Sequence, residues 1–129
     1  MLYHTVAAII IAVLLGEAIK LIVQKAAHVP LRPFHYGGML STHSAAIAAL
    51  CTGVLAETGI SLLFVACVVF STIVALDAYN VRWEVTKHSF ALNERFKTKE
   101  FEIAGHTRPQ VLAGLCLGIL VTILVYMLL

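Results

Sequence analysis

Long apolar runs separated by short polar segments dominate this chain. Four of them stand out, at residues 6–23, 44–55, 60–76 and 111–129. A helix needs roughly 20 apolar residues, with a range of about 17 to 25, to cross a bilayer. The first, third and fourth runs meet this requirement, and the second meets it only if its helix extends from Ser41 to Glu57. The pattern therefore predicts an all-α integral membrane protein built as a four-helix bundle, with residues 1–129 forming a single domain.

Residues 81–105 form the one stretch polar enough to lie in water. Its apolar residues alternate with charged ones, as in a helix that rests on a membrane surface: Val81, Trp83, Val85, Phe90, Leu92, Phe96, Phe101 and Ile103. We therefore expect a short interfacial helix before the last span. Glu57-Thr58-Gly59 predicts a tight turn between the second and third helices, with Gly59 ending the second.

The composition supports a membrane location. Hydrophobic residues make up 60% of the chain and charged residues 12%, whereas a soluble domain has about 25% charged residues. The bilayer is therefore an expected partner, and the net charge of +2 is too small to indicate nucleic acid. Cys51, Cys67 and Cys116 all lie within apolar runs, which favours small core residues over a disulfide framework or a zinc site.

The basic residues predict the orientation in the membrane. All nine Lys and Arg residues lie between Lys20 and Arg32 or between Arg82 and Arg108. With four spans, both stretches fall on one side of the membrane, opposite Glu57 and the two termini. The positive-inside rule places that side in the cytoplasm. We therefore expect a polar site facing the cytoplasm, with both termini on the opposite side.

A polar motif precedes the second apolar run: Gly37-Gly38-Met39-Leu40-Ser41-Thr42-His43-Ser44. Glycine lets the backbone approach a ligand closely, and Ser41 or Thr42 can cap the helix that follows. The free N–H groups of the first helical turn attract anions, and His43 could donate a proton to a leaving oxygen. The alternative interpretation is a capped helix start with an interfacial histidine.

A second motif, Gly105-His106-Thr107-Arg108-Pro109-Gln110, precedes the last run. Thr107 and Gln110 have the spacing of a capping box. A neutral His106 could attack phosphorus and form a covalent phosphoenzyme. A capped helix start without catalysis is again the alternative.

Several cations could complete an anion site. Lys25 and Arg32 have a spacing that can bring both to one phosphate, and arginine offers a planar fork for its oxygens. Lys20 lies one turn from Glu17, so it is either a functional residue or a paired lysine reaching towards the interface. Arg82 follows Asp77 and is either a ligand or an interfacial anchor. The histidines show no HxxxH or HExxH spacing, so we expect no metal.

The order and spacing of these motifs resemble the divergent branch of the type 2 phosphatidic acid phosphatase and vanadium haloperoxidase superfamily. The resemblance covers nearly the whole chain through the two motifs, Asp77-Ala78 with Val81-Arg82, Leu92-Asn93, and Val111 with Gly114. It implies a metal-free and cofactor-free phosphatase in which His43 is the general acid and His106 the nucleophile. The implied phosphate ligands are Arg32, Gly38 and Ser41, with either Lys20, which matches the divergent branch, or Lys25, which matches the main branch. Thr42 and Arg82 are further candidate phosphate ligands.

Three positions depart from the superfamily pattern. Leu40 replaces a proline, Glu100 replaces an arginine, and Gln110 replaces the acidic residue that orients the nucleophilic histidine. Gln110 can form hydrogen bonds but carries no charge. We expect it to keep an orienting role, together with Asp77 and Asn93.

Two hypotheses follow. The first is a membrane-bound phosphatase that hydrolyses a lipid phosphate or a related phosphomonoester or diphosphate through a phosphohistidine. The second is a catalytically degenerate protein that binds phosphate or lipid head groups, or acts as an assembly subunit. A small transporter or channel component is a third interpretation, which four short helices accommodate poorly. Small residues permit close packing within the chain or in a homo-oligomer: Ala45, Ala46, Ala48, Ala49, Gly53, Gly114 and Gly118.

Overall fold

The computed structural model describes residues 2–34, 38–100 and 105–129, and all regular structure in these residues is helical. In chain order the elements are α1 (Leu2–Ala26), α2 (Thr42–Thr58), α3 (Leu62–Leu76), the π-helical turn η1 (Asp77–Val81), α4 (Arg82–Phe96) and α5 (Arg108–Leu128). Gly37, Phe101 and Ile103, which figured in the sequence predictions, lie outside the described residues.

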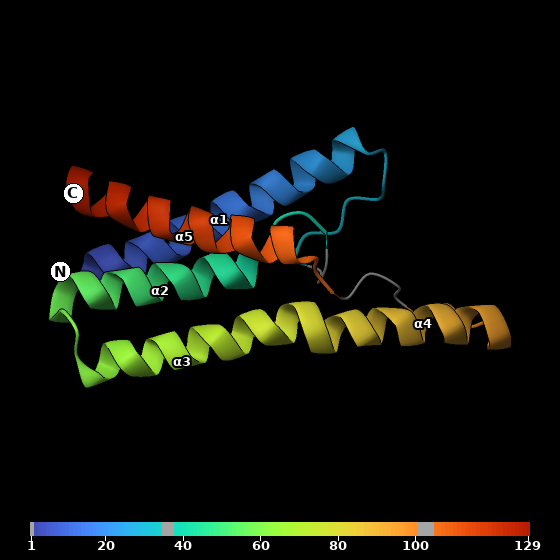
Figure 1. Ribbon diagram of the computed structural model, residues 1–129. Helices are drawn as coiled ribbons and strands as arrows, with labels where there is room; N and C mark the ends of the chain where they lie inside the picture. Colours follow the sequence, from blue (N-terminus) through green and yellow to red (C-terminus); the bar gives the residue numbers. More distant parts are fainter. Residues whose placement is uncertain (1, 35–37, 101–104) are drawn as a thin grey trace.

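The helices form a bundle centred on α2. α2 packs against α1, α3 and α5, and α1 also packs against α5. Figure 1 shows that the N-terminus, the C-terminus and the turn between α2 and α3 lie at one end of the bundle. The end of α1 and the starts of α2 and α5 lie towards the other end (Figure 1). The predicted helical bundle is therefore confirmed, and both basic stretches fall on the same side of it.

The core consists of small side chains contributed in pairs one turn apart. α1 supplies Ala8 and Ala12, α2 supplies Ala45 and Ala49, and α5 supplies Val121 and Val125. Residues four apart lie on the same face of a helix, so each helix presents a narrow, smooth stripe to its neighbours. Small stripes let helices approach closely where water supplies no hydrophobic driving force, as in a membrane.

Two glycines bring α5 especially close to α2. A Cβ atom added to Gly118 would lie 2.9 Å from the Cβ of Ala48 and would also collide with the carbonyl oxygen of Ala45. A Cβ on Gly114, one turn earlier, would collide with the carbonyl oxygen of Ser41. The sequence left open whether these small residues pack within the chain or between chains. In the structure Gly114 and Gly118 pack within it.

α4 differs from the separate interfacial helix that the sequence predicted. It exists, but it continues α3 through η1, so that residues 62–96 form one helix of 35 residues. The physical reason is that no glycine or proline interrupts this stretch, and Asp77 keeps helical dihedral angles. In Figure 1 the continuous rod extends beyond the other helices. The exposed apolar residues expected of an interfacial helix are present on it, including Val85 and Phe96.

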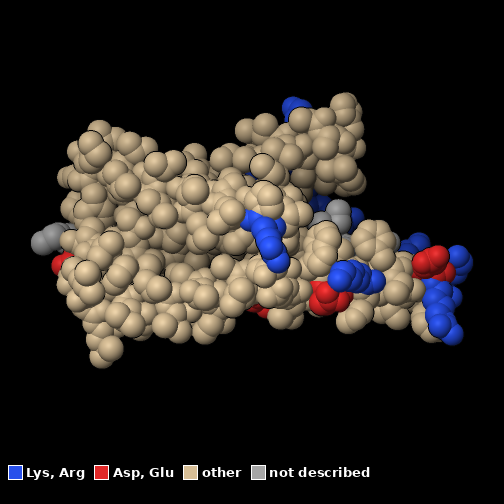
Figure 2. Space-filling model, viewed as in Figure 1, with Lys and Arg blue, Asp and Glu red and all other residues tan. Residues whose placement is uncertain are grey.

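Within the described residues, three helices are long and apolar enough to cross a membrane: α1, the continuous helix of α3 to α4, and α5. α2, at 17 residues, reaches the lower limit of about 17 for a span. Figure 2 shows an uncharged surface over most of the bundle, with Lys, Arg, Asp and Glu gathered mainly towards the end where α4 projects. The predicted turn is also confirmed, because Gly59 ends α2 with a positive φ of 64°.

Gly118→Val should destabilise the fold, because the added side chain must separate α2 from α5. Overpacking of this kind typically costs about 1–3 kcal/mol. The measurement is the free energy of unfolding in mixed detergent and SDS. Cys116→Val, at an exposed position on the same helix, is the control and should leave stability within about 0.5 kcal/mol. Equal stability of the two variants would contradict the proposed close packing.

Candidate functional site

The two histidine-bearing helix starts are joined directly. The backbone N–H of Ser41, at the start of α2, donates to the carbonyl oxygen of Gln110 in the first turn of α5, at 3.2 Å. Ser41 caps α2, as predicted, by accepting from the N–H of Ser44. The predicted capping box of α5 is also present, since the Thr107 N–H donates to Gln110 Oε1 at 2.9 Å. Capping and close helix packing therefore fix the two motifs relative to one another.

His106 is held by backbone groups from two other segments. Its N–H donates to the carbonyl oxygen of Ala78 in η1 at 3.0 Å, and its Nδ1 lies 2.9 Å from the carbonyl oxygen of Gly38. A carbonyl oxygen can only accept, so in this bond Nδ1 carries the proton. The lone pair of the neutral ring is then on Nε2. Gly38 has a positive φ of 83°, which glycine adopts without strain.

Gly105 allows this segment to lie directly against α4. A Cβ atom on Gly105 would come within 2.6 Å of the backbone nitrogen of Trp83. The Gly105 N–H donates to Thr86 Oγ1 at 3.0 Å, and the Thr86 hydroxyl donates to the carbonyl oxygen of Arg82 at 3.1 Å. Sequence analysis missed this role of Thr86, for which only the glycine beside His106 gave a signal.

The surroundings of His106 favour its neutral form. The residue is only 2% exposed, and burial lowers its pKa below the ordinary value of 6.5. The hydrogen bond to Gly38 opposes this shift, whereas the positive charges of Lys20 and Arg82 reinforce it. The net direction is downward. The surroundings therefore favour a neutral His106 ring, in which Nε2 carries the lone pair.

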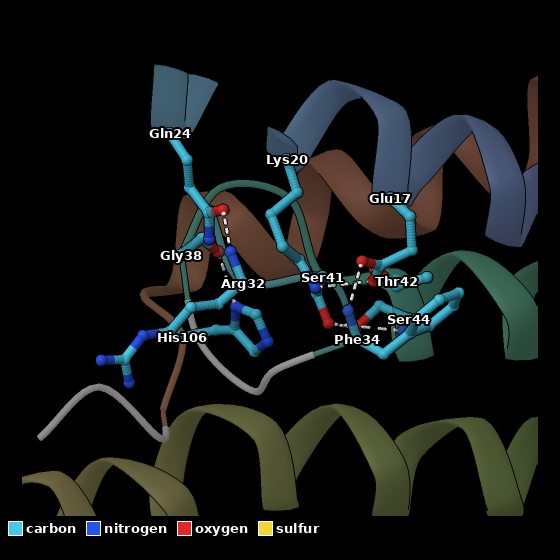
Figure 3. Close-up of polar contacts among 10 residues, drawn as sticks. All are labelled: Glu17, Lys20, Gln24, Arg32, Phe34, Gly38, Ser41, Thr42, Ser44 and His106. Atoms are coloured by element: carbon cyan, nitrogen blue, oxygen red, sulfur yellow. Dashed lines mark hydrogen bonds and ion pairs between the residues drawn. The ribbon is translucent and has the colours of Figure 1, made fainter. Parts of the chain in front are cut away.

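Glu17 connects α1, the following loop and α2 beside this site (Figure 3). Its Oε1 accepts from Lys20 Nζ and from the Thr42 hydroxyl, both at 2.7 Å, and its Oε2 accepts from the N–H of Phe34 at 3.0 Å. Lys20 is 3% exposed, so it is a buried partner of Glu17 rather than a lysine that reaches the interface. The ion pair thus places a cation inside the protein close to His106.

His43 and Arg82 complete the group around His106. His43 is exposed on the first turn of α2 and lines a hollow of about 270 Å³ together with Lys20, Glu17 and Thr42. It interacts electrostatically with Arg82 and Lys20, as His106 does with both. Arg82 Nε donates to Asp77 Oδ2 at 2.6 Å across η1, so Asp77 positions Arg82. One end of the bundle therefore gathers two histidines and two cations.

The structure shows which contacts the predicted phosphate ligands make within the protein. Ser41 is fully buried as a helix cap, and its hydroxyl accepts from the Ser44 hydroxyl. Thr42 donates its hydroxyl to Glu17 at the wall of the hollow that also contains His43. The contribution of Gly38 that the structure shows is a carbonyl bonded to His106, where the sequence suggested a phosphate ligand. Of the two candidate lysines, Lys20 lies in the site, whereas Lys25 is exposed in the last turn of α1.

Three further predicted residues make contacts in the loop after α1, at the end of α4 and in the cap of α5. Arg32 is exposed in the loop after α1, where its backbone N–H donates to Gln24 Oε1 at 3.0 Å. Asn93 holds the end of α4 by bonding to the backbone of Glu100, far along the rod from His106. Gln110 supports His106 through the cap of α5, not through the ring. Among the described residues, no group of three His, Cys, Asp or Glu side chains could hold a metal ion.

The fold and the composition of its surface define an integral membrane protein of the helical class. Residues 1–121 match the divergent PAP2 family, and the chain belongs to this family. An uncharacterised membrane protein of Bacillus subtilis (strain 168), YuiD, is 35% identical in an alignment that covers 67% of this chain and 69% of the relative. No solved structure matches the chain. The predicted relationship to a divergent branch is thus confirmed.

Removing one partner of the Glu17–Lys20 pair should strongly destabilise the protein, because the other charge stays buried. The expected loss for Glu17→Gln or Lys20→Met alone is about 3–5 kcal/mol. The double variant should lose less than the sum of the two, in a double-mutant cycle read by unfolding in SDS. Lys87→Met breaks the exposed pair with Glu84, at 57% exposure for both side chains, and should change little. Additive losses at Glu17 and Lys20 would contradict their coupling.

Proposed function

We propose that this protein is a membrane-bound phosphatase that hydrolyses a lipid phosphate or a related phosphomonoester or diphosphate through a phosphohistidine. The observation that carries the proposal is the bond between His106 Nδ1 and the Gly38 carbonyl oxygen, which leaves Nε2 unprotonated in a buried site. A neutral imidazole with a fixed tautomer is what nucleophilic attack on phosphorus requires. Membership of the divergent PAP2 family agrees with this chemistry.

The proposed reaction has two steps. In the first, the Nε2 lone pair of His106 attacks phosphorus, the bond from phosphorus to the ester oxygen breaks, and protonated His43 gives its proton to that oxygen. In the second, His43 takes a proton from water as the water oxygen attacks phosphorus and the P–N bond breaks, which releases phosphate and regenerates neutral His106. His43 suits proton exchange because it is exposed beside a hollow.

Lys20 and Arg82 would stabilise the negative charge that builds up on the phosphoryl oxygens. Both interact electrostatically with His106, and both are fixed by carboxylates, at Glu17 and Asp77. Preorganised cations in a site that excludes water stabilise a transition state more than solvated ones. The carboxylates reduce the net positive charge but hold each cation in place. The proposal therefore assigns phosphate binding to these two residues.

The Gly38 carbonyl takes over part of the role that an acidic residue at position 110 would have towards the His106 ring. An acidic residue beside a nucleophilic histidine fixes the ring and stabilises its charged form. A carbonyl oxygen fixes the ring and the tautomer equally well, but it offers a partial charge in place of a full one. We infer a working but slower nucleophile. We also infer from the basic loops that the site faces the cytoplasm, with both termini on the other side.

His106→Ala should abolish phosphate release by the purified protein in detergent from a panel of lipid phosphates and diphosphates. Loss of a nucleophile typically lowers the rate by several orders of magnitude. The exposed His88, on α4, provides the control, and His88→Ala should retain full activity. Quenching in SDS at alkaline pH with ³²P-labelled substrate should trap a base-stable, acid-labile phosphoprotein in the wild type and none in His106→Ala.

Two outcomes would contradict the proposed catalytic mechanism. Full turnover by His106→Ala would contradict the nucleophile assignment. No turnover by the wild type, together with thermal stabilisation by inorganic phosphate, would favour the degenerate binding protein. In that case the anion pocket has been kept and the chemistry lost.

The acid limb of the pH profile of kcat/KM should lie at lower pH than an ordinary histidine would give. His106 attacks only when neutral, so kcat/KM falls as the pH drops through its pKa in the free enzyme. Because burial holds that pKa below 6.5, activity should persist into more acidic solution than an ordinary histidine permits. A pH–rate profile whose acid limb has its midpoint at or above 6.5 would contradict this account of the site.

A further inference from the structure

The hollow beside His106 adjoins an apolar groove between α3 and α5. A hollow of about 320 Å³ contains His106 and shares Tyr79 and Arg108 with a neighbouring cavity of about 360 Å³. That cavity shares Ala75, Leu76 and Leu115 with a third, of about 280 Å³. The shared lining residues show that the three spaces adjoin one another in this order. They form a row of hollows that leads from His106 along α3 and α5.

The packing of the bundle explains the groove. α3 packs against α2, whereas α5 packs against α1 and α2, so α3 and α5 flank the same helix on different faces. α2 closes the bottom of the space between them, and its Cys51 lines the cavity of about 280 Å³. Along α3 and η1 the lining extends from Val68 to Tyr79, which corresponds to roughly 16 Å of helix. Its walls are mainly aliphatic, so it suits an extended hydrocarbon chain better than a polar group.

Arg108 marks the boundary between the polar hollow and the apolar groove. It lines both spaces, and its guanidinium carbon lies 5.0 Å from the centre of the Tyr79 ring. Stacking on an aromatic ring limits the positions of an arginine side chain and leaves the edges of the guanidinium open to oxygen ligands. Arg108 also begins α5, where the positive end of the helix dipole adds to its charge.

We propose that the groove holds one hydrocarbon chain of an amphiphilic phosphate ester, with its phosphate at His106, where Arg108 would add its charge to those of Lys20 and Arg82. This inference rests on the proposed function for the position of the phosphate. The sequence of lining residues indicates the occupant. Arg108 and His106 line one end of the row of hollows, and mainly aliphatic side chains line the rest. A free phosphate ion would use only the polar end. Arg108 thereby gains a role in substrate binding that the sequence did not suggest.

Binding of alkyl phosphonates tests the proposal without turnover, because their C–P bond resists hydrolysis. Dissociation constants for dodecyl and butyl phosphonate would be measured by native mass spectrometry in one detergent, for the wild type and Ala75→Phe. Ala75 lines both apolar cavities, so phenylalanine there fills the groove. Affinity for dodecyl phosphonate should fall at least about tenfold, since several buried CH₂ groups lose their contacts. Affinity for butyl phosphonate should not change.

Ala66→Phe is the matched control, since Ala66 is exposed on α3 and lies half a turn from the groove side. It should bind both phosphonates like the wild type. If Ala75→Phe does not fold, Leu115→Phe can be tested in its place, because phenylalanine at position 115 fills the groove from α5. Arg108→Gln should weaken binding of both phosphonates at least about tenfold, as expected on losing a charged hydrogen-bonding partner.

The outcomes separate this inference from the proposed function. One result would support the groove and reject the phosphatase: Ala75→Phe loses affinity for dodecyl phosphonate only, and the wild type releases no phosphate from any ester. A second result would reject the groove and support the phosphatase: the wild type releases phosphate, and Ala75→Phe binds dodecyl phosphonate as tightly as Ala66→Phe does. Unchanged binding in Arg108→Gln would overturn the role of Arg108.

Discussion

The close approach of α2 and α5 is the constraint on which the rest of the structure depends. Gly114 and Gly118 have no side chains, so the backbones of the two helices come into contact. Contact at Gly114 brings the start of α2 to the start of α5, where the Ser41 N–H meets the Gln110 carbonyl oxygen. The two histidine motifs precede these helix starts. Helix packing deep in the bundle thus determines the geometry of a site at its end.

Charge at this end is balanced locally. Lys20 and Arg82 each have a carboxylate partner, Glu17 and Asp77, so the chain can keep cations in an environment that would otherwise disfavour them. The same arrangement keeps His106 neutral, because burial and neighbouring positive charge act in the same direction on its pKa. On the proposed function, these cations bind the phosphate, and His106 presents a basic imidazole nitrogen to it. These properties connect the membrane fold to the proposed phosphoryl chemistry.

Local patterns in the sequence predicted the features that depend on local physics. Apolar runs predicted the helices, Gly59 the end of α2, and the Thr107 and Gln110 pair the capping box. Features that depend on contacts between distant segments were less accessible. Spacing alone could not choose between Lys20 and Lys25, because the choice depends on the direction of each side chain from α1. The bond from Gly38 to His106 joins residues 68 apart, and a backbone carbonyl leaves no signature in a sequence.

The tautomer of His106 is the measurement that tests the central claim most directly. ¹⁵N-histidine labelling of the protein, with assignment by comparison to His106→Gln, would give the chemical shifts of both ring nitrogens at neutral pH. The structure predicts a neutral ring with a protonated Nδ1 and an unprotonated Nε2, because the Gly38 carbonyl oxygen accepts from Nδ1. A ring protonated on Nε2, or a doubly protonated imidazolium, would contradict the account of His106 as the nucleophile.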